Sequence, residues 1–180
     1  MTAAPDPALL TLEDWFALGE DESLRRAEVC RGVLEVSPSP RPEHSDALLS
    51  IAGQLRAQVS HRQFRVLHEL DVILDGGTRP TVRQPDVLIL RAGAAAPITA
   101  RDVLLAIEIL SPTSLQRDRW TKRAEYAAAG IPNYWIIDLD GPSAEVLTLV
   151  DGRYEGSVVT ERIQVDGDLP LVVDLADLQR

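Results

Sequence analysis

The stretch Val103-Leu-Leu-Ala-Ile-Glu-Ile-Leu110 carries a single charged residue, Glu108, among seven apolar ones. A run this apolar is typical of a strand that is covered on both faces of a sheet. Runs at 64–74 and 86–91 predict two further strands of the same mostly buried sheet, and 133–139 predicts another buried strand. An unpaired carboxylate in such a strand would be costly, so Glu108 must be neutral, paired or bound to a cation. A structural pair with an arginine is the alternative interpretation.

Composition indicates one globular domain spanning residues 1–180, since 45% of the residues are apolar and 26% are charged. The single cysteine, Cys30, cannot form an internal disulfide, which favours a reducing compartment. No apolar run reaches the ~18–20 residues that a membrane helix needs. Residues 1–10 lack the features of a signal peptide. We therefore expect a cytoplasmic protein without a membrane partner.

Helical and hairpin patterns fill the rest of the chain. Helices are predicted at 11–19, 43–62 and 114–129, and hairpins at 27–37 around Gly32 and at 144–160 around Asp151-Gly152. The first helix begins with the capping pattern Thr11-Leu-Glu-Asp14, and Leu12, Trp15 and Phe16 are expected to face inward. Residues 168–178 predict a short closing strand or turn. This order of elements indicates a mixed α/β or α+β domain.

A second carboxylate follows a proline at the entrance of a predicted strand. Asp86 stands in Gln84-Pro85-Asp86-Val87, where it could simply accept a nearby backbone N–H. If the strands at 86–91 and 103–110 pair, however, Asp86 and Glu108 converge at one edge of the sheet. Two hard oxygen ligands suit Mg²⁺ or Mn²⁺ better than Zn²⁺.

The chain contains 17 arginines and one lysine, Lys122. Asp118, Lys122 and Tyr126 are four residues apart, so they share one face of the predicted helix, while Trp120 and nearby alanines are expected to face the core. A compact ammonium can orient a water or a phosphate oxygen where a guanidinium cannot. Two alternatives are that a single lysine remains by chance in an arginine-rich chain, and that Lys122 belongs to a solvated basic face of the helix. If Lys122 is exposed, Lys122→Arg should change the free energy of unfolding by no more than about 0.5 kcal/mol.

The formal charge of −10 argues against a protein that coats nucleic acid by bulk electrostatics. Residues 31–136 nevertheless hold 13 basic and 11 acidic groups, which permits contact with a polyanion. His44 begins a predicted helix after the proline-rich loop 37–42 and could reach a phosphate or a carboxylate. The phosphate-loop, dinucleotide, serine-hydrolase and zinc-protease motifs are absent.

These residues resemble the Uma2 family of the PD-(D/E)XK nuclease superfamily. The matching segments are Glu28 before a hairpin and Gly32; Pro38–His44; Pro85-Asp86-Val87; Ile107-Glu-Ile-Leu-Ser-Pro112; Asp118 through Lys122 to Tyr126; and Gly130-Ile-Pro-Asn-Tyr-Trp-Ile-Ile-Asp138. The resemblance implies a restriction-endonuclease-like core, in which helices flank a central mixed β-sheet, with a C-terminal β-hairpin. It covers nearly the whole chain, and the last two segments are the most specific.

The resemblance also implies a divalent-metal site of Asp86 and Glu108, completed by Glu28, with Mg²⁺ or Mn²⁺ as cofactor. The usual lysine of the superfamily would stand at Leu110, so Lys122 must supply the ammonium. Under this interpretation Asp86, Glu108, Lys122 and Glu28 are the catalytic residues. The candidate substrate-binding residues are His44, Tyr126 and Arg119.

The function that follows is Mg²⁺-dependent endonucleolytic hydrolysis of DNA phosphodiester bonds. The alternative is a catalytically weak or inactive nuclease fold that acts as a dimeric binding or regulatory module; the charge of −10 and the displaced lysine favour it. Hydrolysis of a small phosphodiester would also fit the acidity, but no specific residue indicates it. Related proteins often pair, so we expect a homodimer that forms through the hairpin at 144–160.

Overall fold

A six-stranded mixed sheet forms the centre of the computed structural model, which describes residues 9–19, 21–112 and 114–178. The strand order is β10-β9-β8-β7-β6-β3, and all neighbours are antiparallel except β7 and β8. The strands are β3 (Phe64–His68), β6 (Val87–Arg91), β7 (Val103–Ile109), β8 (Asn133–Asp138), β9 (Ser143–Val150) and β10 (Arg153–Val159). The predicted mixed α/β class is therefore confirmed.

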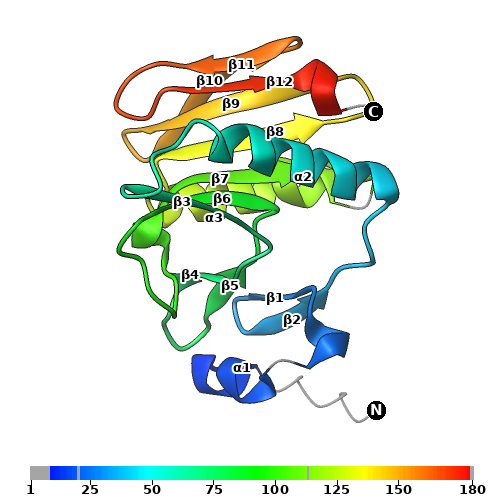
Figure 1. Cartoon of the computed structure of the whole chain (residues 1–180). Helices are drawn as coiled ribbons and strands as arrows, with labels where there is room; N and C mark the ends of the chain where they lie inside the picture. Colours follow the sequence, from blue (N-terminus) through cyan, green and yellow to red (C-terminus); the bar gives the residue numbers. More distant parts are fainter. Residues whose placement is uncertain (1–8, 20, 113, 179–180) are drawn as a thin grey trace.

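Both faces of this sheet are covered, as the apolar run of β7 predicted. Helix α2 (Pro42–Arg56) crosses one face, and helix α3 (Arg123–Ala128) lies against the other (Figure 1). Ile89 and Ile107 belong to the core under α2, whereas their neighbours Leu88 and Ala106 belong to the core under α3. This alternation follows from the two-residue period of a strand.

A smaller, four-stranded sheet lies below the central one in Figure 1. Its order is β2-β1-β5-β4, with β1 (Ala27–Cys30), β2 (Val33–Val36), β4 (Val72–Asp75) and β5 (Thr81–Arg83). The predicted hairpin around Gly32 is confirmed as β1 and β2. The single strand expected at 64–74 is wrong, because the chain turns at Glu69, whose φ is 47°, and continues in the other sheet.

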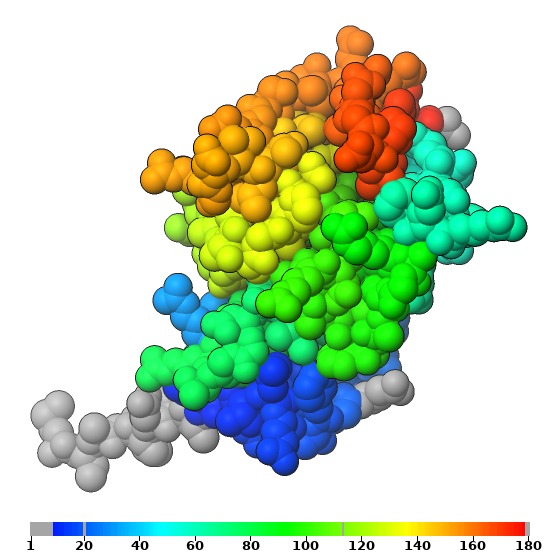
Figure 2. Space-filling view, turned by 90° about the vertical axis from the view of Figure 1, so that its left-hand side faces the viewer, coloured from blue at the N-terminus to red at the C-terminus, as the bar shows by residue number. Residues whose placement is uncertain are grey.

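The first and last described segments, blue and red in Figure 2, lie at opposite ends of the molecule. Beyond the hairpin of β9 and β10, the strands β11 (Arg162–Val165) and β12 (Leu171–Asp174) form a two-stranded sheet. The capped helix α1 (Leu12–Leu18) has the predicted capping box but buries no residue, and Phe16 is 53% exposed. The predicted inward face is wrong for Phe16, because this two-turn helix lies on the outside of the small sheet.

Two further boundaries differ from expectation, and one prediction cannot be compared. Helix α2 ends at Arg56 rather than at 62, although Val59 is still buried in the same core. The strands β5 and β11 were not predicted, since each is only three or four residues long. The prediction that no signal peptide is present rests largely on residues 1–8, which lie outside the described residues. In the parts of the chain that are described, every helix is too short or too polar to cross a membrane.

Candidate active site

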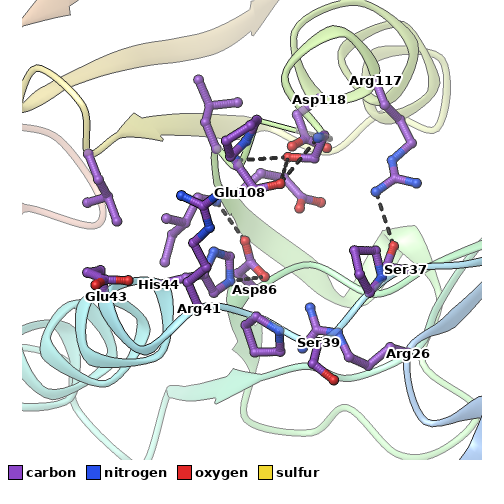
Figure 3. Close-up of a pocket in the computed structure, with 18 of the residues that line it drawn as sticks. Arg26, Ser37, Ser39, Arg41, Glu43, His44, Asp86, Glu108, Arg117 and Asp118 are labelled. Carbon is purple, nitrogen blue, oxygen red and sulfur yellow. Dashed lines mark hydrogen bonds and ion pairs between the residues drawn. The ribbon is translucent and has the colours of Figure 1, made fainter.

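A cleft of about 750 Å³ opens where β6 begins and β7 ends, beneath the first turn of α2 (Figure 3). One wall is the extended segment from Ser37 to Arg41, which we call the strap. The opposite wall is formed by Ser111, Pro112, Ser114, Arg117 and Asp118. Asp86, Glu108 and Lys122 line the floor and are each no more than 7% exposed. Charged side chains are buried this deeply only where partners hold them.

Asp86 and Glu108 are cross-strand neighbours at this floor. Val87 pairs with Ile107 in antiparallel register, so the residues that follow outward, Asp86 and Glu108, lie side by side. Asp86 Oδ2 accepts the backbone N–H of Ile109 at 2.7 Å, and Asp86 Oδ1 lies 3.1 Å from His44 Nε2. The predicted pairing of the two acids at one sheet edge is confirmed, and His44 contacts a carboxylate.

Lys122 enters the floor from the helix that crosses from β7 to β8. Its Nζ donates to Glu108 Oε1 at 2.8 Å and to Glu28 Oε1 at 2.9 Å, and it lies 3.8 Å from Asp118 Oδ1. The solvated-face interpretation is therefore wrong, and so is its consequence that arginine would be tolerated as at an exposed site, because Lys122 is only 3% exposed. Burial would lower the pKa of Lys122, but the surrounding carboxylates raise it, so the ammonium stays charged.

The helix that carries Lys122 buries its polar side in the interior of the protein. It begins with a π-helical turn, Arg117–Lys122, and continues as α3. Asp118, Lys122 and Tyr126 are buried together, whereas Trp120 is 74% exposed. The predicted core side with Trp120 is wrong, because the face with Asp118, Lys122 and Tyr126 is turned inward. Lys122 meets buried carboxylates there, and Tyr126 also belongs to the apolar core under α3.

Glu108 is surrounded by like charges. Burial raises its pKa well above the usual range, and the carboxylates of Asp118, Asp86 and Glu28 add to this effect against the opposing pull of Lys122. Tyr126 is fully buried beside it and donates its hydroxyl to Glu108 Oε1 at 2.7 Å. The predicted contact of Tyr126 with the site is present, but the ring lies beneath Glu108 and does not line the cleft.

Glu28 belongs to the small sheet and is fixed from two sides. Its Oε1 accepts the backbone N–H of Gln84 at 2.9 Å as well as the Lys122 ammonium, and its Oε2 accepts Arg83 Nη1 at 3.0 Å. Burial alone would raise the pKa of Glu28, but Lys122 and Arg83 lower it to about 2. Glu28 therefore stays ionised and joins the small sheet to the lysine.

We expect this carboxylate to make the fold acid-sensitive. A depressed pKa contributes stability above the unfolded value of 4.5, which is lost as the pH falls toward about 2. The difference in unfolding free energy between wild type and Glu28→Gln should be largest above about pH 5, at most about 3 kcal/mol, and should shrink toward about pH 3. Urea unfolding across this range measures it, with the exposed Glu155→Gln as the matched control. A difference that does not change with pH would contradict the assignment.

Arg83 is the part of the site that sequence reasoning missed. It is completely buried, and its guanidinium reaches Glu28, Glu35 at 2.7 Å and Glu125 at 2.7 Å. Its only signal in the sequence is its place directly before Gln84-Pro85-Asp86, at the end of a three-residue strand. Through these contacts Arg83 connects the hairpin of β1 and β2 to helix α3.

The sequence of the chain matches the Uma2 family model, described as "Putative restriction endonuclease", over residues 10–176. The chain belongs to the Uma2 family. A solved structure with a similar fold is that of "a putative nuclease belonging to DUF820" from Anabaena variabilis ATCC 29413, with a TM-score of 0.75 and 22% identity over 94% of this chain and 97% of that one. The restriction-endonuclease-like core that the sequence predicted is thereby confirmed. No relative among curated proteins matches the chain.

In this Uma2 protein the donor set fits a divalent cation held by two carboxylates. Within the described residues, no group of three or more His, Cys, Asp or Glu side chains is arranged around a metal position. Glu28 is already paired with the cations of Arg83 and Lys122. Asp86 contacts His44 and a backbone N–H, and Glu108 accepts its hydrogen bonds from described residues through Oε1, so these two carboxylates are the better candidates. Asp118 Oδ1 is buried and accepts no hydrogen bond from any described residue, a further sign of excess negative charge. Mg²⁺ commonly binds through one or two carboxylates and completes its shell with water and phosphate oxygens.

Arg119 is, with Tyr126, a predicted site residue of this Uma2 chain that does not line the cleft. Its guanidinium lies 3.1 Å from Asp138 and 3.1 Å from Glu145, on the side of the helix that faces β8 and β9. Two residues earlier, Arg117 does line the cleft. The angular step of about 100° per residue in a helix separates these two side chains.

Proposed function

We propose that this protein is an endonuclease that hydrolyses DNA phosphodiester bonds with Mg²⁺ or Mn²⁺. The observation that carries the proposal is the Lys122 ammonium beside Glu108, next to Asp86, on the floor of an open cleft. Membership of a family described as "Putative restriction endonuclease" supports it. The divalent cation would be held by Asp86 and Glu108, and when bound it supplies charge neutralisation at the phosphate and an acidified water.

The side chains around these carboxylates have distinct tasks in this proposal. Lys122 offers an ammonium hydrogen to the attacking water or to a non-bridging phosphate oxygen, which stabilises the charge that develops there. Glu28 positions Lys122 and keeps it charged. His44 fixes the orientation of Asp86, and Tyr126 fixes that of Glu108. Because most of these contacts already exist, little reorganisation is needed when substrate binds.

A binding or regulatory module without cleavage is the second candidate. The observation that favours it is that Glu28 and Glu108 engage Lys122 at the same time, which leaves one of the three ammonium hydrogens for a substrate. The formal charge of −10 also opposes tight binding of a polyanion. The two candidates differ in whether any phosphodiester bond is broken.

A nuclease assay separates them. Supercoiled plasmid and single-stranded circular DNA are incubated with the purified protein in Mg²⁺, in Mn²⁺ and in EDTA, with Glu108→Gln as the site-disrupted control. We expect cleavage of DNA by wild type with either metal, and none in EDTA or by the variant. Binding of DNA without cleavage in either metal would support the second candidate, and cleavage in EDTA would exclude the metal-dependent mechanism.

We also propose that the protein is a homodimer that pairs through the hairpin of β9 and β10. Strand β10 lies at the edge of the six-stranded sheet, and its Val158 is 64% exposed. Exposed apolar edge strands favour pairing with another chain. Light scattering at micromolar concentration should give twice the chain mass of 19.7 kDa, and a monomer mass would refute the pairing.

A further inference from the structure

The floor of the cleft lies too deep for the side of a double helix. Glu108 and Lys122 are each 3% exposed and Asp86 is 7% exposed, so a reacting phosphate must enter between the strap and the opposite wall. The cleft volume of about 750 Å³ lies within the range of pockets that enclose a drug-sized ligand, about 300–1,000 Å³. A space of this size accommodates a short piece of one flexible strand.

The rim of the cleft offers cations for the flanking phosphates. Arg26, Arg41 and Arg117 stand around Asp86 and Glu108 in Figure 3. Arg117 Nη2 donates to Ser37 Oγ at 3.2 Å, while Arg117 Nε and Arg26 Nε are buried without a hydrogen-bond partner in the described structure. The acidic residues at the rim are Glu43 and Asp140.

The three arginines differ in how much of their charge is already used. Arg26 Nη1 donates to Glu69 at 2.7 Å, whereas Arg41 is exposed and makes no ion pair within the described residues. Arg117 also makes no ion pair there; its Nη2 donates to the neutral hydroxyl of Ser37, and its charge acts on the carboxylate of Asp118 from a greater distance. Neither Arg41 nor Arg117 is held in an ion pair within the described residues, so both guanidinium groups can bind phosphate oxygens.

A second hollow continues the path of a strand past the strap. It measures about 720 Å³ and shares five lining residues with the first, namely Arg26, Ser37, Ser39, Pro40 and Gln84. The three prolines at 38, 40 and 42 restrict the strap, since each fixes its own φ. A nucleic-acid strand that leaves the floor of the cleft can therefore continue into the second hollow along the conformationally restricted strap.

We infer that the cleft takes a single strand of DNA, whose phosphates are bound by Arg26, Arg41 and Arg117 along the strap. The inference rests on the proposed function and specifies its substrate class. No Phe, Tyr or Trp lines either hollow in the described structure, so bases have no aromatic ring on which to stack. The protein therefore recognises the sugar-phosphate backbone of the DNA. Such binding is weak, depends little on base sequence and decreases with salt concentration.

Binding without cleavage tests the inference. A labelled mixed-sequence oligonucleotide and the same oligonucleotide annealed to its complement are titrated by fluorescence anisotropy, in EDTA and in Ca²⁺, over a series of NaCl concentrations. We expect the single strand to bind about tenfold more tightly than the duplex. Each phosphate contact on a single strand contributes about 0.7 to the slope of log K against log salt, so three contacts give a slope of about −2.

Two variants and a matched control locate the contacts. Arg41→Ala and Arg117→Ala should each weaken binding and reduce the slope by about 0.7, and Arg117→Lys should restore the slope. Arg56→Ala removes the same charge from the other end of α2, about 20 Å from Arg41, and should change neither quantity. Circular dichroism confirms that each variant is folded.

Failure of this inference can be told apart from failure of the proposed function. Equal or tighter binding of the duplex, no binding of either DNA in both conditions, or variants that match Arg56→Ala would each overturn the inference, even if the protein cleaves DNA. Arginine-dependent binding of the single strand supports it, even if Mg²⁺ and Mn²⁺ give no cleavage.

Discussion

Glu108→Gln is expected to abolish metal-dependent cleavage and to leave the fold as stable as wild type or more stable at neutral pH. The amide removes one of the two carboxylates proposed to hold the cation, so the rate should fall by about 10²–10³ or more. The side chain keeps its shape and still accepts the Tyr126 hydroxyl. Lys122 keeps its contact with Glu28 at 2.9 Å.

The stability of Glu108→Gln follows from the sign of the pKa shift. The pKa of Glu108 is raised in the folded state, so its ionisation costs stability as the pH rises above the unfolded value of 4.5. The amide does not ionise, and the variant should therefore gain relative to wild type between about pH 5 and about pH 8.

Urea unfolding at these two pH values and Mn²⁺ calorimetry measure the two effects of Glu108→Gln, and the exposed Glu155→Gln serves as control. If Glu108→Gln retained wild-type cleavage, or bound Mn²⁺ as wild type does, Glu108 would not be a ligand. A variant that unfolds at neutral pH would show instead that the ionised carboxylate is needed as a partner of Lys122.

Lys122→Arg is expected to lower the cleavage rate about 10²-fold and, unlike an exposed substitution, to destabilise the fold. The planar guanidinium is larger than an ammonium and must fit between Glu28 and Glu108, whose oxygens lie 2.9 and 2.8 Å from Nζ. Overpacking of a filled interior costs about 1–3 kcal/mol. Because Lys122→Arg preserves the positive charge, a loss of cleavage rate would show that the position of this charge matters.

Lys122→Met provides the contrast, because it removes the charge from nearly the same volume. Breaking a buried ion pair on one side costs about 3–5 kcal/mol, so this variant should be the less stable of the two. Rates are compared in saturating Mg²⁺ at a temperature where urea unfolding shows each protein to be folded, with Arg56→Lys as the control. Equal rates for wild type and Lys122→Arg would restrict Lys122 to a structural role.

The pairing of Asp86 with Glu108 could be predicted because it depends on strands alone. Asp86 stands at the start of one apolar run and Glu108 near the end of the other. Once these strands are antiparallel neighbours, the two acids lie together. The hairpins around Gly32 and Asp151-Gly152 were predictable for a similar reason, since their turn residues adopt positive φ values. Local patterns of this kind carry their own structural constraint.

The burial of Lys122 and the role of Arg83 could not be predicted in this way. Helical periodicity identifies two faces of a helix, but it assigns the apolar one to the interior. Here the inward face carries Asp118 and Lys122, and Lys122 pairs with buried carboxylates. Arg83 lies on a three-residue strand, too short for any periodicity, and its partners Glu28 and Glu125 are 55 and 42 residues away along the chain. Such long-range ion pairs exist only once the small sheet has formed and packed against helix α3.

The ion pairs that join the small sheet to the helix above it restrict how this protein can change over evolution. Val72 of β4 lies in the apolar core under α3, but the buried Ala27 and Val29 of the hairpin belong to neither of the two apolar cores. Glu28 and Arg83 therefore carry much of the attachment of the hairpin. The same two residues position Lys122, because Glu28 contacts its ammonium and Arg83 fixes Glu28. Selection for a faster or slower reaction would therefore act on stability as well, and substitutions at Glu28, Arg83 and Lys122 would be tolerated most readily in compensating combinations.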